Sequence, residues 1–253
     1  MENFIASTFG IFLISTLRYF IIAGVAFFIF YKVMLRKVSK AKIQSRHAGR
    51  KDFLHEIFHS VQSTAVISLV AAVVLFSPLR AYTMVYTDID RFGILYLVLS
   101  VILALVIHDT YFYWMHRLLH HPKLFRYAHL THHKSTNPSP WTSYSFHIIE
   151  AVFEGMVLIV LVMVIPTHRF AIMAFVLMGF IINVYGHLGY EIMPKWFRNS
   201  WLFGWINTSI HHNLHHSKFN GNYGLYFRFW DRVMGTENPN YVKEYDRVQQ
   251  QRF

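Results

Sequence analysis

Five long runs of apolar residues constrain the fold of this 253-residue chain more than any other feature. They cover about residues 9–35, 60–77, 92–113, 147–165 and 169–189. Several of them approach the roughly 20 residues that a helix needs to cross a bilayer. Because 54% of the residues are hydrophobic and only 15% are charged, the composition is too apolar for an ordinary soluble domain. We predict an all-α integral membrane protein with about four or five transmembrane helices, the first of them a retained anchor.

Histidine is concentrated beside the ends of these runs, in four short clusters. They read His108-Asp109-(x)6-His116-(x)3-His120-His121, His129-Leu130-Thr131-His132-His133, Asn183-(x)3-His187, and His211-His212-Asn213-Leu214-His215-His216. Two of them contain an HxxHH box, against a chance expectation of about 0.08 boxes. Since residues three and four apart share a helix face, we expect each box to aim three imidazoles at one point. With no cysteine in the chain, the pattern predicts a metal site built almost wholly from imidazole.

The positive charge predicts the orientation of the chain. The net charge of +11 is densest after the first apolar run, at Arg36, Lys37, Lys40, Lys42, Arg46, Arg50 and Lys51. Such a block marks the cytoplasmic side of a membrane and argues against a nucleic-acid partner. If this side is cytoplasmic, the second run leaves it and the third returns to it. The last two runs, which turn at 165–169, leave and return in the same way. All four clusters then lie at the cytoplasmic face. Arg80, Arg91 and Arg169 lie on the other side and weigh against this orientation. Because Arg18 lies near the middle of the first run, we expect that run to tilt, to break, or to direct this charge towards an interface.

Nine imidazoles exceed the needs of one metal ion and predict two. The candidate ligands are His116, His120, His129, His132, His133, His187, His212, His215 and His216. Imidazole suits iron, zinc, copper and nickel, so the ligands alone do not identify the metal. Carboxylates should accept hydrogen bonds from the outer imidazole N–H groups, and the candidates are Asp109, Glu150, Glu154, Glu191 and Asp231. No catalytic residue beyond the metal ligands is predicted.

A second set of residues could surround the metals or replace a ligand. It comprises His108, Asp109, His121, His147, Glu150, Asn183, His211 and Asp231. His121 competes with His120, which we favour, and His211 should point about 100° away from His212 on a helix. We assign His55 and His59 to an amphipathic helix at the membrane surface, and His47 and His168 to solvated loops.

The quoted segments resemble the integral-membrane fatty acid hydroxylase/sterol desaturase superfamily, the histidine-box diiron oxygenases. The resemblance extends over about 108–236, including Asn222-Tyr223-Gly224 and Trp230-Asp231-Arg232-(x)2-Gly235-Thr236. It describes a single membrane domain with spans in 1–107, a catalytic region in 108–236 and a polar tail in 237–253. We expect 219–236 to close over the site and the tail to be partly disordered.

What the resemblance implies is a membrane enzyme that uses two ferrous ions, O2 and electrons from a separate protein. Its substrate would be a lipid, such as a fatty acyl chain or a sterol, which it would hydroxylate or desaturate. The site would face the cytoplasm, at a bacterial inner membrane or the endoplasmic reticulum. Because few residues precede the first run, we expect no fused cytochrome b5 domain. The donor would be a cytochrome b5-like protein, a ferredoxin or a flavoprotein reductase.

Two other functions remain open from the residues alone. A membrane zinc-dependent hydrolase would bind metal through histidines, although the HExxH motif that pairs such ligands with a glutamate base is absent. A metal transporter would combine spans with histidines, but its ligands would normally lie near the bilayer midplane rather than at the ends of the spans.

Overall fold

The computed structural model describes residues 2–46 and 48–253, and most of them are helical. The longer helices are α1 (Glu2–Phe28), α3 (Arg50–Phe76), α4 (Gly93–Leu119), α7 (Ile148–Val164), α8 (Arg169–Gly186), α9 (Ser209–Lys218) and α11 (Tyr241–Arg252). Short helices connect them: α2 (Leu35–Val38), α5 (Pro122–Ala128), α6 (Leu130–His133), α10 (Phe229–Val233), the π-helical η1 (Ile29–Val33), and the 3-10 segments η2 (Ser39–Ala41), η3 (Pro78–Tyr82), η4 (Ile89–Arg91), η5 (Pro140–Tyr144), η6 (Lys195–Asn199) and η7 (Trp201–Gly204).

Four helices among the described residues are long and apolar enough to cross a membrane. They are Phe4–Val33, Arg50–Phe76, Gly93–Leu119 and Arg169–Gly186. The fourth predicted run forms α7, which at 17 residues is about 25 Å long, close to the thickness of a hydrocarbon core. These helices confirm the predicted all-α membrane fold with about four or five spans. The second span begins near Arg50 rather than at residue 60, because the segment with His55 and His59 continues without a break into α3.

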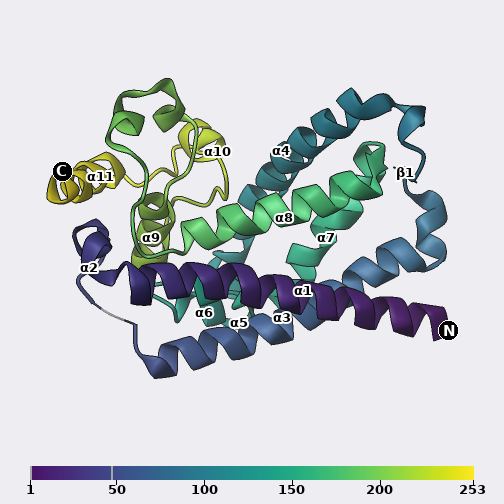
Figure 1. The fold of residues 1–253 in the computed structure, drawn as a ribbon, viewed down its shortest axis with the longest axis horizontal. Coiled ribbons are helices and arrows are strands. Elements are labelled where there is room, and N and C mark those ends of the chain that lie inside the picture. The colour runs from purple at the N-terminus through teal and green to yellow at the C-terminus, as the bar shows by residue number, and fades with distance from the viewer. Residues whose placement is uncertain (1, 47) are drawn as a thin grey trace.

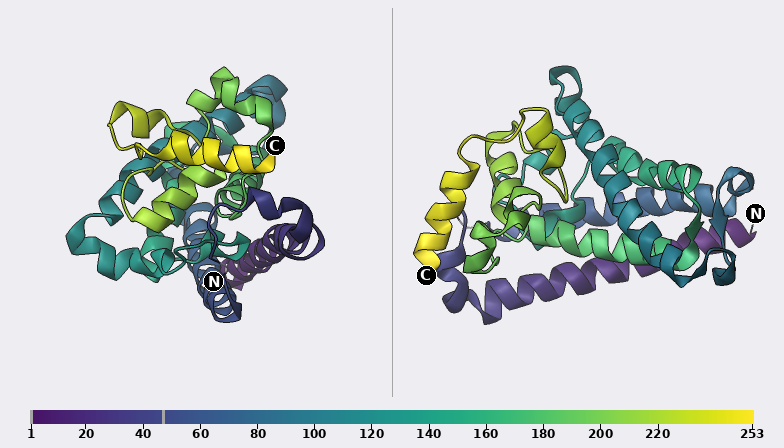
Figure 2. Two further views of the ribbon diagram at one scale, coloured as in Figure 1. Left: turned by 90° about the vertical axis from the view of Figure 1, so that its left-hand side faces the viewer. Right: turned by 90° about the horizontal axis from the view of Figure 1, so that it is seen from above.

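The long helices form one bundle, in which α1 and α7 pack on α3 and α8 packs on α4. Figure 1 shows the N-terminus at one end of the bundle and α9, α10 and α11 at the other, and Figure 2 shows the same separation from above. Arg18 does not break α1. Its guanidinium lies 3.4 Å from the Tyr144 hydroxyl and 5.5 Å from the centroid of the Phe180 ring. Its charge is therefore directed into the bundle, where aromatic groups contact it.

The hairpin between the last two spans turns where the sequence predicted, since α7 ends at Val164 and α8 begins at Arg169. Two short parallel strands lie at this turn, β1 (Val85–Tyr86) beside β2 (Thr167–His168). The prediction of a solvated His168 is wrong, because only 1% of this residue is exposed. Its Nε2 donates to the Thr87 carbonyl, and its Nδ1 accepts from the Phe170 N–H as the N-cap of α8.

The segment after the last span, residues 187–253, folds into a cap at one end of the bundle (Figure 1). The expectation of a partly disordered tail is wrong, because α11 is an ordered helix. Its residues Tyr241, Tyr245 and Val248 are fully buried in an apolar cluster with Phe203 and Ile210. The polar residues of the tail alternate with this apolar face at helical spacing, which explains why average composition concealed the helix.

Candidate metal centre

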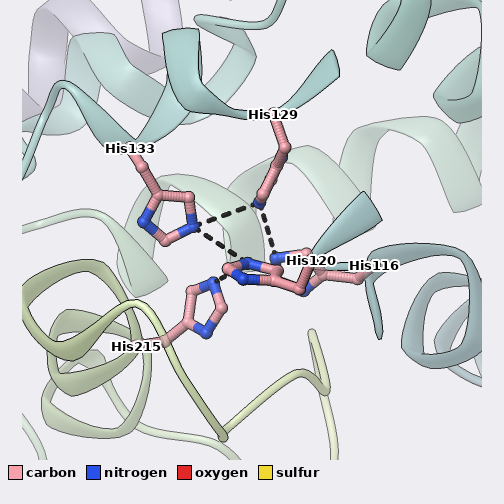
Figure 3. Close-up of side chains that lie close together, drawn as sticks. All are labelled: His116, His120, His129, His133 and His215. Carbon is pink, nitrogen blue, oxygen red and sulfur yellow. Dashed lines mark hydrogen bonds between the residues drawn. The ribbon is translucent and has the colours of Figure 1, made fainter. Parts of the chain in front are cut away.

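All nine predicted ligands lie together at the end of the bundle that carries the cap. They form two groups whose nitrogen atoms lie within 4.8 Å of one another in each group. The five-histidine cluster contains His116, His120, His129, His133 and His215, and Figure 3 shows its rings converging. The four-histidine cluster contains His132, His187, His212 and His216. The two clusters are neighbours, because the His133 and His216 rings stack with centroids 5.0 Å apart.

Each HxxHH box is divided between the two clusters, so the expectation that a box aims three imidazoles at one point is wrong. In the first box His129 and His133 belong to the five-histidine cluster and His132 to the other. In the second box the division is reversed, with His215 in the five-histidine cluster. Residues four apart stay together on one helix face, and the remaining histidine is rotated towards the second point. Each box therefore holds the two clusters side by side.

The spacing between ring nitrogens in the five-histidine cluster fits ligands of one metal ion. Two imidazole nitrogens at about 2.1 Å from an ion and at right angles would lie about 3.0 Å apart. The Nε2 atom of His129 lies 3.0 Å from that of His116 and 3.1 Å from that of His133. The Nε2 atom of His120 lies 3.1 Å from that of His133 and 3.2 Å from that of His215. Figure 3 marks these four contacts.

The four-histidine cluster has the same arrangement. The Nε2 atom of His187 lies 2.9 Å from that of His212, 3.2 Å from that of His216 and 3.4 Å from that of His132. His212 and His216 lie 3.2 Å apart through the same atoms. All nine side chains thus present Nε2, and none presents Nδ1, towards the centre of its cluster.

The outer nitrogen of most of these rings contacts a main-chain carbonyl. The Nδ1 atoms of His116, His132, His187, His215 and His216 lie 2.7–3.3 Å from the carbonyl oxygens of Tyr223, Ser145, Asn183, Gly221 and Ser135, respectively. A carbonyl oxygen only accepts, so each of these Nδ1 atoms carries the proton and the neutral ring has a lone pair at Nε2. Two facing lone pairs cannot hydrogen-bond to each other. A cation between them would satisfy both, so the donor set fits a metal at each cluster.

Burial keeps these imidazoles uncharged. Burial lowers the pKa of His215 to about 4, and it also lowers the pKa values of His129 and His216, to which neighbouring imidazoles contribute. The exposed fractions of these three residues are 1% or less. Neutral imidazole is the form that binds a metal ion. Both clusters are therefore ready to coordinate a cation near neutral pH without first losing protons.

One predicted carboxylate contacts a cluster histidine directly. The Glu150 Oε1 atom lies 2.7 Å from Nδ1 of His129, and both residues are almost fully buried. Two other predicted carboxylates act on the segment that lines the five-histidine cluster. Asp109 Oδ1 accepts from three successive N–H groups, those of 225–227, and Asp231 accepts from the N–H groups of Tyr223 and Gly224. Tyr223 in turn supplies the carbonyl that contacts His116.

The expectation that residues 219–236 close over the site agrees with these contacts. Besides Tyr223, this segment supplies the Gly221 carbonyl, which lies 2.7 Å from His215 Nδ1, and the Phe219 ring, which packs on His133. Gly221 has a φ of +72°, and a Cβ atom there would lie 2.5 Å from the Thr236 carbonyl oxygen. Only glycine fits this turn without strain.

The other predicted residues lie outside both clusters. His121 is exposed and caps α5, and His147 caps α7, each accepting at Nδ1 from an N–H two residues later. Nδ1 of His108 contacts the Tyr226 hydroxyl at 2.8 Å. His211 is fully buried against Tyr241, and neither ring nitrogen has a partner among the described residues. The Asn183 side chain donates to the Ser143 carbonyl.

The remaining candidates are placed as follows. Glu191 accepts from the Tyr185 hydroxyl and from the N–H groups of Met193 and Ile210, and Oε1 of Glu154 is buried without a partner among the described atoms. His55 packs on His59 within α3, away from both clusters. His47 lies outside the described residues.

Sequence reasoning missed Glu56, a fully buried carboxylate in α3. It accepts from the hydroxyls of Ser135 at 2.9 Å and Ser139 at 2.5 Å. The Ser135 carbonyl then contacts Nδ1 of His216. Glu56 therefore fixes the loop that follows the first HxxHH box. An ionisable residue in the first turns of a spanning helix was the available signal.

Comparisons with known proteins match the part of the sequence that carries both clusters. The family profile described as fatty acid hydroxylase matches residues 101–236. A Delta(7)-sterol 5(6)-desaturase of Gibberella zeae is 33% identical over 181 residues, which are 72% of this chain and 54% of that protein. The lathosterol oxidase of Rattus norvegicus is 33% identical over 183 residues, covering 72% of this chain and 60% of the relative. The lathosterol oxidase of Homo sapiens is 31% identical over 201 residues, which are 75% of this chain and 66% of that protein.

The chain thus spans between about half and two thirds of the length of these curated relatives. No solved structure matches it.

Proposed function

Because the chain belongs to the fatty acid hydroxylase family, we propose that it is a membrane-bound diiron oxidoreductase that hydroxylates or desaturates a lipid. The observation that carries the proposal is the pair of histidine clusters, in which nine Nε2 atoms face one another at the spacing of metal ligands. Iron is the proposed metal because neutral imidazole suits it and because a metal that activates O2 must change its oxidation state, which zinc does not. When bound, two iron ions would activate O2 with electrons from a donor.

The protein's own contribution to this chemistry is to hold the metal ions, to orient the imidazole rings and to shield the site from bulk water. Main-chain carbonyls contact Nδ1 of five of the nine rings and hold those rings with Nε2 directed at the centre of the cluster. The Glu150 carboxylate lies beside Nδ1 of a sixth, His129. Eight of the nine proposed ligands are buried, and His120 is partly exposed. The site therefore excludes bulk water except near His120, which limits unproductive side reactions.

The substrate is proposed from the names of the relatives. The first is a sterol desaturase whose name places the new double bond at the 5(6) position of a Delta(7)-sterol, and two others are lathosterol oxidases. We propose a sterol or a related ring lipid as the first substrate to test, ahead of a fatty acyl chain. Such a substrate would reach the site from the bilayer.

The active site is proposed to face the cytoplasm, and the electrons to come from a separate protein. The basic residues between Arg36 and Lys51 follow the first span and are placed at the same end as the histidines. The positive-inside bias assigns this end to the cytoplasm. An acidic cytochrome b5-like protein, ferredoxin or flavoprotein reductase could dock against this charge.

Product analysis tests the proposal. Membranes containing the protein would be incubated with O2, a reductase system and either a Delta(7)-sterol or a fatty acyl lipid, and the lipids would be analysed by mass spectrometry. We expect loss of two hydrogens or gain of one oxygen, abolished in His215→Ala. Release of a hydrolysed lipid without consumption of O2 would instead indicate a zinc-dependent hydrolase.

A further inference from the structure

Large aromatic and apolar side chains are exposed on the cap, outside the candidate spans. Ten such residues lie in 187–253, and four of them come from two neighbouring short segments: Trp201, Trp205, Phe229 and Val233, with exposed fractions of 76%, 48%, 42% and 60%. We refer to these four residues as the aromatic face. They come from η7, the residue after it, and α10. Contact of this much apolar surface with water is unfavourable, and such patches mark interaction surfaces.

The aromatic face continues onto a spanning helix through a row of rings. Trp205 stacks on Phe229 with centroids 6.3 Å apart, and Phe229 contacts Trp230 at 5.2 Å. Trp230 contacts Trp114 of α4 at 5.6 Å. A row of rings from Trp205 to Trp114 therefore joins the cap to the spanning helix, and Figure 1 shows α10 beside the cap end of α4.

The contact lies on the lipid-facing side of α4. The indole N–H of Trp230 donates to the Thr110 hydroxyl at 3.1 Å. Positions four and eight residues before Thr110, Val106 and Ile102, are 47% and 55% exposed, and Trp114 four residues after it is 44% exposed. Residues four apart share a helix face, so α10 packs on the apolar stripe that a bilayer would cover.

The depth of this contact corresponds to the edge of the hydrocarbon core. Thr110 lies about 26 Å along α4 from Gly93, at 1.5 Å per residue, and the core is about 30 Å thick. Aromatic side chains with polar atoms, tryptophan above all, are enriched at this level. Two cations lie beside the row: the Arg117 guanidinium is 5.9 Å from the Trp114 ring, and the exposed Arg232 contacts the Gly204 carbonyl.

We propose that the aromatic face lies in the headgroup region of the bilayer, so that the cap is partly embedded in the membrane beside α4. Its occupant is lipid, because the surface is continuous with the lipid-facing stripe of a spanning helix and is flanked by arginines that can pair with lipid phosphates. The proposal is independent of the metal and of the reaction.

Site-directed spin labelling tests the proposal directly, because the chain contains no cysteine. Val233→Cys and Phe229→Cys would each carry a nitroxide in the full chain reconstituted into phosphatidylcholine vesicles. Ile102→Cys on the lipid-facing stripe and Lys243→Cys on the exposed side of α11 serve as controls for lipid and water. All four variants change side chains that are at least partly exposed, so the fold should be retained.

The measured quantity is the collision rate of each label with oxygen, which concentrates in lipid, relative to that with a water-soluble nickel complex. We expect the labels at Val233 and Phe229 to favour oxygen, as at Ile102, and to lie nearer the headgroups than Ile102. Lys243 should favour the nickel complex. Labels at both tested positions that behave like Lys243, or that are shielded from both reagents by a second copy of the chain, would overturn the proposal.

Discussion

The Glu150 carboxylate should set how tightly the five-histidine cluster holds its metal. Among the described residues, it is the one carboxylate in contact with a cluster histidine, at 2.7 Å from His129 Nδ1. Both groups are almost fully buried, at 2% and 1% exposed, so bulk water does not compete for this contact. Changes to such outer partners typically weaken metal affinity about 10- to 100-fold, or about 1.4–2.8 kcal/mol. We expect Glu150→Ala to fall in this range.

Glu150→Gln should have a smaller effect, because it keeps the size of the side chain and a polar oxygen beside His129 Nδ1 while the negative charge is lost. The assay is the anaerobic release of iron to a chelator, followed in time. Glu150→Ala should release one of two irons faster and leave the other unchanged, since Glu150 does not contact the four-histidine cluster. Glu154→Ala is the matched control, one turn further along α7 and without a histidine contact. Equal release from Glu150→Ala and Glu154→Ala would refute the reasoning.

Three further predictions follow from the same contacts. His132→Ala and His215→Ala should each lower the amount of bound metal and abolish lipid oxidation, because each removes one Nε2 from a different cluster. Elemental analysis and product formation measure the two effects. Wild-type activity in either variant would contradict the shared site. Glu56→Ala should weaken metal binding at the four-histidine cluster, because it frees Ser135, whose carbonyl contacts His216. Ser60→Ala on the same helix, which removes a contact with the Trp141 carbonyl, should not. Equal rates of iron release to a chelator from the two variants would count against this role of Glu56. For the metal-free protein, burial lowers the pKa of His215 from 6.5 to about 4. The contribution of this residue to stability is therefore complete above about pH 6.5 and is lost as the pH falls towards 4. The midpoint of thermal unfolding should be lower at about pH 5 than at about pH 7.5, and an unchanged midpoint would argue against a neutral buried cluster.

The sequence predicted the composition of the site but not its division into two clusters. Nine histidines stood out because their spacing is improbable by chance, and the family profile confirms the resemblance that these segments carry. Helical spacing indicates which residues share a helix face, but it does not indicate which of the two histidine clusters each face contributes to. That choice depends on the rotation of α6 and α9 against each other, which long-range packing decides.

Other differences came from contacts distant in the sequence. Glu56 lies 79 residues from the serine it holds, and nothing in the local pattern pairs the two. His168 was interpreted as solvated because it lies in a turn, yet the adjoining strand β1 buries it. His121 and His147 lie near cluster residues but cap helices, a role that depends on backbone geometry at the helix start.

The central claim is that the two histidine clusters hold two iron ions, and counting the metal tests it most directly. The measurement is elemental mass spectrometry on protein purified anaerobically in detergent from iron-replete cells. The account predicts close to two irons per chain, falling towards one in a variant that disrupts a single cluster. One tightly held zinc without iron, even after incubation with ferrous iron, would contradict it.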